Sequence, residues 1–132
     1  MVLYDNSLVR LNYNPATDIL DVDCPDFNPL MMTEVKEAFS VIVETVKHYD
    51  VKKLLIDSSK ATIDTSNHEH KGVLIKFARD LMDTRLQKLA RVGTQDFLRE
   101  KNVSEAREEA MFSIAFQNFP DKAAAQAWLN MN

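Results

Sequence analysis

The clearest pattern in the sequence is an amphipathic segment, at about residues 29–49, that leads directly into a short apolar run. Apolar side chains recur in the segment at the i, i+3, i+4, i+7 spacing of a helix, and charged side chains fill the opposite face. The run that follows, residues 51–57, is apolar at its centre and ends in Asp57. A run of this kind between two helices is typical of a central parallel strand that is buried on both faces. The pair therefore predicts an α/β fold.

Two alternating segments precede this helix. Residues 7–14 and residues 19–24 alternate apolar and polar side chains with the period of a half-buried strand. Between them, Pro15 presets φ for a turn, and the Asn14 and Asp18 side chains can hydrogen-bond nearby backbone groups. These features predict an antiparallel hairpin at the start of the chain.

The second half of the chain continues the alternation of helices and strands. Further elements are predicted at residues 66–86, 88–94, 104–110 and 112–119, and in a last helix that Asp121 caps. The order β-β-α-β-α-β-α-β-α predicts one domain over residues 1–132, with a mixed, mostly parallel five-stranded sheet and helices on it.

The composition excludes several classes of protein. The formal net charge is -4, and the basic residues are interleaved with acidic ones, as at residues 79–80 and 107–109. This pattern indicates solvated helix faces and argues against nucleic-acid binding, which needs a basic surface. No signal peptide pattern occurs, and no stretch approaches the roughly 20 apolar residues that span a bilayer. We therefore expect a cytoplasmic protein with no membrane span.

The sequence offers no set of residues with catalytic spacing. Gly72 and Gly93 stand alone, so there is no Gly-rich phosphate loop. Cys24, the only cysteine, excludes an intramolecular disulfide and a Cys-based zinc cluster. Its neighbours Asp23 and Asp26 raise the pKa of a thiol, which predicts a small, partly buried hydrophobe there. We therefore expect no enzyme, no cofactor and no metal site.

Three short segments carry a resemblance to a known family. They are the opening hairpin around Asn14-Pro15, the central strand ending in Asp57, and a closing pattern F-x-D-x-x-x-A-x-x-W-L at Phe119, Asp121, Ala125, Trp128 and Leu129. Together with the order of elements, these segments resemble the STAS-like (SpoIIAA-like) domain family, in particular its small stand-alone bacterial members. The resemblance implies a SpoIIAA-like fold and a non-enzymatic regulatory or protein-interaction module.

The resemblance also implies a phosphorylation switch. In anti-sigma-factor antagonists of this kind, a partner kinase phosphorylates a serine at a helix start, within an Asp-Ser-Ser-Gly sequence. The nearest segment here is residues 64–67, where Thr65 and Asn67 depart from that pattern. The resemblance thus suggests phosphoacceptors, namely Thr65 and Ser66, and a partner or ligand loop formed by Asp57, Ser58, Asp64 and Asn67.

Two interpretations of Ser66 are open. A phosphate at a helix N-terminus would meet free backbone N–H groups and the positive end of the helix dipole. Alternatively, Ser66 and Glu69 form an S-x-x-E capping box and nothing more, in which case Ser66 contributes about 1 kcal/mol as an N-cap.

A second functional hypothesis is a carrier for a small apolar ligand or lipid. Other relatives in the resembled family are similar to lipid-transfer domains in part of their sheet. Phe27, Met31 and Phe39 are the candidates to line such a pocket, between the sheet and the helices. Flexible methionine side chains suit an adaptable site, although they also fill gaps in a core. The expected partners are therefore a protein, a second copy of this chain as a homodimer, or a small apolar molecule.

Overall fold

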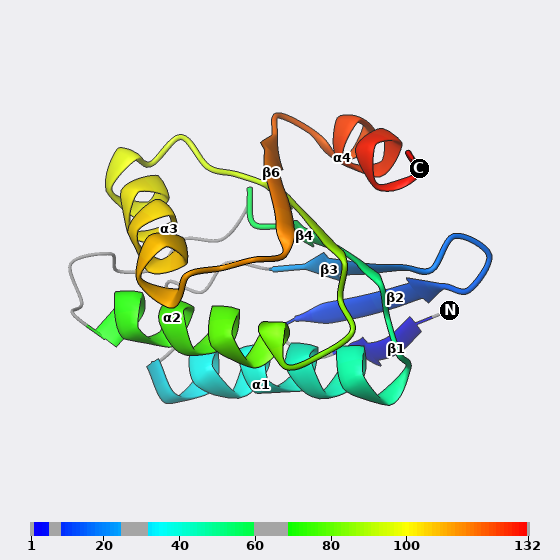
Figure 1. Cartoon of the computed structure of the whole chain (residues 1–132), viewed down its shortest axis with the longest axis horizontal. Coiled ribbons are helices and arrows are strands. Elements are labelled where there is room, and N and C mark those ends of the chain that lie inside the picture. Colours follow the sequence, from blue (N-terminus) through cyan, green and yellow to red (C-terminus); the bar gives the residue numbers. More distant parts are fainter. Residues whose placement is uncertain (1, 6–8, 25–31, 60–68, 132) are drawn as a thin grey trace.

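The computed structural model describes residues 2–5, 9–24, 32–59 and 69–131. They form a single sheet with helices on both of its faces (Figure 1). The strands are β1 (Val2–Asp5), β2 (Arg10–Asn14), β3 (Ile19–Asp23), β4 (Lys53–Asp57), β5 (Lys88–Val92) and β6 (Ala115–Phe119). The helices are α1 (Met32–His48), α2 (Glu69–Met82), α3 (Phe97–Ala110) and α4 (Lys122–Leu129).

The strands lie in the sheet in the same order as in the chain, from β1 to β6. The pairs β1–β2 and β2–β3 are antiparallel, and the pairs β3–β4, β4–β5 and β5–β6 are parallel. The helices α1, α2 and α3 each connect two parallel neighbours. Because such crossovers are right-handed and all run in one direction along the sheet, these helices cover the same face.

The predicted opening turn is confirmed. The Asn14 carbonyl accepts a hydrogen bond from the Thr17 N–H at 3.3 Å, and the Asn14 Oδ1 accepts one from the Ala16 N–H at 3.0 Å. Asp18 has a φ of 56° and accepts a hydrogen bond from the Tyr13 hydroxyl at 2.7 Å. Asn14 therefore bonds a nearby backbone group as the sequence indicated, whereas Asp18 bonds the Tyr13 side chain and the distant Lys52 N–H.

Two hydrophobic cores form, one on each face of the sheet. Successive side chains of a strand point to opposite faces, so Leu54 and Ile56 of β4 join the core under α1 and α2, and Leu55 joins the core under α4. Figure 1 shows α4 across the sheet from α1 and α2. The smaller core consists of Ile19, Leu55, Ala90, Val92, Ala125 and Leu129, with Phe119 and Trp128 packed against it.

The predicted α/β, SpoIIAA-like fold class is confirmed, and two elements differ from the prediction. The sheet has a further strand, β1, and so contains six strands where five were predicted. Its four residues, VLYD, are too few to show a period. Helix α3 begins at Phe97, whereas the sequence predicted a helix only from residue 104.

Candidate functional site

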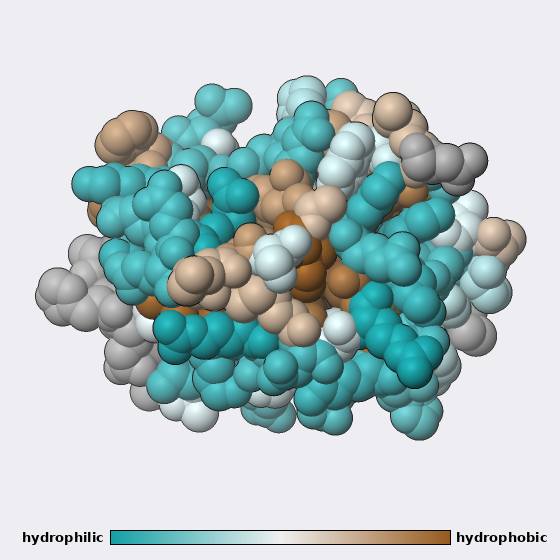
Figure 2. Space-filling view, in the orientation of Figure 1, coloured by the Kyte–Doolittle hydropathy of each residue, from teal (hydrophilic) through white to brown (hydrophobic). Residues whose placement is uncertain are grey.

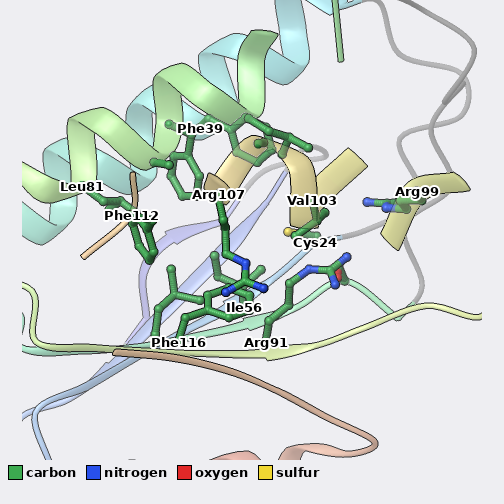
Figure 3. A pocket seen from close by; sticks show the side chains of 16 residues that line it. Cys24, Phe39, Ile56, Leu81, Arg91, Arg99, Val103, Arg107, Phe112 and Phe116 are labelled. Carbon is green, nitrogen blue, oxygen red and sulfur yellow. The ribbon is translucent and has the colours of Figure 1, made fainter. Parts of the chain in front are cut away.

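A cavity of about 80 Å³ lies between the sheet and the helices α2 and α3. It is several times larger than the ~10–15 Å³ that a single water molecule needs, and about half of a ~150 Å³ cavity that binds benzene. Figure 3 shows the side chains that surround it. They are Cys24, Phe39, Ile56, Ser58, Leu74, Phe77, Ala78, Leu81, Leu89, Arg91, Arg99, Val103, Ala106, Arg107, Phe112 and Phe116.

Most of the cavity wall is apolar. The sheet supplies Ile56, Leu89 and Phe116, because these residues occupy the strand positions that face the larger helix layer. The Phe39 ring from α1 stacks on the Phe77 ring from α2, with the ring centroids 4.7 Å apart. A wall of this composition favours an apolar ligand and binds water weakly.

Arg91 places a charge in this apolar wall. Arg91 lies two residues after Leu89 in β5 and therefore points to the same face of the sheet. Its side chain is buried, with 6% of the residue exposed. The guanidinium is held by Glu100 of α3: Nη1 donates to Oε1 at 2.6 Å and Nη2 donates to Oε2 at 2.9 Å. This is the bidentate arrangement in which a buried arginine is best neutralised.

Glu100 is fixed as a carboxylate by its surroundings. Burial alone would raise its pKa, but the hydrogen bonds and charge of Arg91 outweigh burial, so the pKa lies below its usual value. The hydroxyl of Thr94 also donates to Oε2 at 2.8 Å. A Cβ atom on Gly93 would lie 2.7 Å from Oε1, so this position needs glycine if the carboxylate is to stay in place.

Arg99 is a second buried arginine of the cavity wall. It lies in the first turn of α3, where its backbone N–H donates to the N-cap residue Asp96 at 3.1 Å. Burial lowers the pKa of Arg99, and the positive charge of Arg91 acts in the same direction. The Arg91 and Arg99 side chains therefore lie in the same part of the cavity wall.

Arg107 is the third arginine, and its guanidinium lies over the Phe116 ring, 4.0 Å from the centroid. Figure 3 shows the side chain extending from α3 into the cavity above Phe116. Its Nε is buried and has no hydrogen-bond partner among the described residues. A buried donor without a partner costs about 1–3 kcal/mol, so this atom is poised to bind an acceptor.

The remaining polar groups of the cavity are inert. Burial raises the pKa of Cys24 to about 12, so its thiol stays protonated. The prediction that Cys24 acts as a small hydrophobic residue is confirmed. The residue is buried, whereas partial burial was predicted. Ser58 is also buried, and its hydroxyl donates to the Val92 carbonyl at 2.8 Å.

The structure separates the predicted site residues. Phe39 and Ser58 line the cavity. Asp57 follows Ile56 along β4 and therefore points to the opposite face, where its Oδ1 accepts hydrogen bonds from the Ser59 N–H at 3.0 Å and the Ser59 hydroxyl at 2.6 Å. It caps a turn. Phe27, Met31, Asp64, Thr65, Ser66 and Asn67 lie outside the described residues.

The three arginines of the cavity were not predicted from the sequence. Residues 107–109 were interpreted as a solvated helix face, which is wrong for Arg107, because its guanidinium packs on Phe116. The sequence did contain a sign of the buried Arg91. This residue lies two positions after Leu89, on the same face of a strand that is mostly apolar and buried. A charged residue at such a position is a reason to look for a partner or a ligand.

The surface around the cavity is also apolar in part. Phe112, Ile114 and Phe116 are half-buried and pack against the larger core. Figure 2 shows hydrophobic surface across the centre of this face, between hydrophilic borders, where the α3–β6 connection and β6 run in Figure 1. An apolar approach of this kind suits a ligand with an apolar body.

The described ranges contain neither a metal-binding cluster nor a membrane-spanning helix. Within them, no cluster of three or more His, Cys, Asp or Glu side chains is arranged to hold a metal ion. The helices of the described residues include none with the length and hydrophobicity to cross a membrane. On the face covered by α4, the Lys122 ammonium group donates to Asp23 at 2.6 Å and to Asp21 at 3.3 Å.

The strand order and the helix layers define a SpoIIAA-like α/β fold, and a solved structure shares it. This chain is similar to an uncharacterised protein of the DUF3478 family with a SpoIIAA-like fold from Shewanella loihica PV-4. The sequences are 16% identical, the match covers 96% of this chain and 98% of that chain, and the TM-score is 0.58. At this identity the similarity shows the fold alone. No family model and no curated protein matches the sequence.

Proposed function

We propose that the protein is a non-enzymatic binding module that holds a small, mainly apolar ligand in the cavity between the sheet, α2 and α3. The observation that carries this proposal is the cavity itself, about 80 Å³ in volume, with an apolar wall interrupted by a few fixed polar groups. Apolar walls with few, well-placed polar groups are the common form of small-molecule sites. The ligand class agrees with the apolar-ligand hypothesis from the sequence, in which Phe39 was a lining candidate.

The chemistry of the cavity supports binding rather than turnover. Guanidinium groups stay charged at any physiological pH and are poor proton carriers. The Cys24 thiol, with its pKa raised to about 12, is a weak nucleophile. Glu100 is engaged by Arg91 and Thr94, which stabilises its carboxylate and makes it a poor base.

A titration with 1-hexanol, followed by amide chemical shifts in NMR spectra, tests the proposal. We expect saturable shifts at cavity residues such as Phe77 and Leu89. Val103→Phe fills the cavity from α3 and should abolish them, whereas Val41→Phe makes the same change at a half-buried residue outside the cavity and should not. Shifts that are absent, or that persist in Val103→Phe, would count against a ligand site here.

A regulatory or protein-interaction role is the second candidate. Large apolar side chains are exposed at both ends of α3: Phe97 (80%), Leu98 (44%) and Met111 (82%). Exposed aromatic and methionine side chains are typical of contact surfaces. A protein partner or a second copy of the chain on α3 would touch the helix that also forms the cavity wall, and could thus sense a ligand.

Native mass spectrometry of the protein, purified from its own host, separates these candidates. A mass excess that is lost on denaturation supports the ligand carrier. A complex mass, or a phosphate mapped to Thr65 or Ser66, supports the regulatory module. A bare, unmodified monomer would count against both.

A further inference from the structure

We propose that the ligand carries a single carboxylate and that Arg107 binds it. This inference rests on the proposed function, because it names the chemical class of the ligand in the same cavity. The ligand then has two parts: an apolar body against the apolar wall, and one carboxylate that accepts hydrogen bonds from the Arg107 guanidinium.

Arg91 and Arg107 differ in their partners. Both line the cavity. The fork of Arg91 is filled by both oxygens of Glu100, at 2.6 and 2.9 Å. The guanidinium of Arg107 has the Phe116 ring on its face, and its buried Nε has no hydrogen-bond partner among the described residues. A new anion therefore meets Arg107 without displacing a carboxylate of the protein.

The buried Nε of Arg107 has an unfavourable free energy as long as no acceptor binds it. An aromatic ring stabilises the face of a guanidinium, but it does not accept hydrogen bonds in the guanidinium plane. The Nε atom is buried, so solvent does not replace the missing acceptor. A carboxylate would supply that acceptor in the plane, and would also neutralise the charge.

The charge of Arg107 and the size of the cavity favour a carboxylate as the head group of the ligand. One guanidinium neutralises one negative charge, which favours a carboxylate over a doubly charged phosphate ester. A carboxylate is also the anion that the protein itself places beside Arg91, in the form of Glu100. The cavity of about 80 Å³ is about half the size of one that binds benzene, so it suits a short apolar chain rather than a ring next to such a group.

The test compares three probes that share one apolar chain: hexanoate, 1-hexanol and hexyl phosphate, each titrated by NMR at pH 7.5. We expect hexanoate to bind about tenfold more tightly than 1-hexanol, as for one charge-assisted hydrogen-bonded pair. Arg107→Met keeps the aliphatic bulk and should remove this preference while 1-hexanol still binds, which also shows that the variant is folded. Arg79→Met, at an exposed arginine of α2 outside the cavity, should leave the preference unchanged.

Each outcome decides between the two proposals. If 1-hexanol binds and hexanoate binds no better, the proposal of a ligand cavity is supported and the proposal of a carboxylate head group is wrong. If hexyl phosphate binds more tightly than hexanoate, the head group is a phosphate and the proposal of a carboxylate head group is again wrong. If the preference for hexanoate survives in Arg107→Met, Arg107 is not the residue that binds it. If none of the probes binds, the proposed function falls and this inference falls with it.

Discussion

Single side chains show how this protein keeps charge inside an apolar wall. Arg91 is buried in the sheet, and burying a guanidinium is tolerated only when its charge is neutralised and its donors are bonded. Glu100 meets both needs with one carboxylate. The carboxylate reaches Arg91 because Gly93 leaves room for it, so a residue without a side chain is part of this ion pair.

Replacing Glu100 with glutamine should lower the free energy of unfolding substantially. The change leaves Arg91 buried without a counter-charge, and we expect a loss of roughly 2–3 kcal/mol, less than the ~3–5 kcal/mol of a fully buried pair because Glu100 is partly exposed. Urea denaturation measures the loss. Glu108→Gln, at an exposed residue of the same helix, is the matched control and should change stability little. Equal losses in the two variants would contradict the assigned role of the pair.

The pH dependence of this loss has a defined sign. Because the folded-state pKa of Glu100 is lowered from 4.5, its contribution is fully present above pH 4.5 and is lost as the pH falls through the lowered value. The difference in stability between the wild-type protein and Glu100→Gln should therefore be constant near neutral pH and shrink in acid. Denaturation curves between pH 3 and pH 7 test this, and a difference that grows in acid would contradict it.

Removing the charge of Asp21 should have the opposite effect on stability to removing the charge of Glu100, because the pKa of Asp21 is raised and that of Glu100 is lowered. Burial raises its pKa above 3.8 even though Lys122 lowers it, so the ionised form is unfavourable in the folded protein. Asp21→Asn should therefore stabilise the protein at pH 7, and the gain should disappear as the pH falls to the usual pKa of an aspartate. Asp23→Asn is the control, because Asp23 is more exposed and shares the same Lys122. A loss of stability in Asp21→Asn at pH 7 would show that the lysine contact outweighs burial.

Helix α3 shows why part of the site could not be predicted from the sequence. Its inward positions hold Arg99, Val103, Ala106, Arg107 and Ala110, so charged residues stand where a search for helical periodicity expects apolar ones. The first half of the helix was therefore not predicted. The same arginines form the polar part of the cavity. A local pattern could reveal neither, because burial of a charge becomes favourable only when a distant residue such as Phe116 or Glu100 is brought to it.

The end of α3 offers a direct test of its backbone geometry. Met111 follows the helix with a φ of 56°, and its N–H donates to the carbonyls of Arg107 and Glu108. The left-handed conformation is unfavourable for residues with a Cβ, and the Met111 side chain is exposed and packs little. Met111→Gly should therefore raise the free energy of unfolding by about 0.5–1 kcal/mol. Thermal denaturation measures the gain, and Met111→Ala, which removes the side chain but keeps the Cβ, should not show it.

The two faces of the sheet belong to two different hydrophobic cores. Strands β4 and β5 send alternate side chains to the larger core under α1 and α2 and to the smaller core under α4. This arrangement explains why most of the fold could be predicted: a central strand that is apolar on both faces indicates helices on both sides. It also explains why the cavity could not. Its wall combines residues from most elements of the larger layer, which only the folded chain brings together.

The shared strands predict that the two cores unfold together. Leu129→Ala opens a cavity in the smaller core and should cost about 2–5 kcal/mol, whereas Leu129→Met keeps the volume and should cost less than about 1.5 kcal/mol. Trp128, the only tryptophan, reports on α4 by fluorescence, and far-UV circular dichroism reports on all the helices. Because α4 packs on strands that the other core also needs, both signals should move to the same lower midpoint in Leu129→Ala. If only the fluorescence transition moved, α4 would be a separately unfolding unit, and the sheet would be held by the larger core alone.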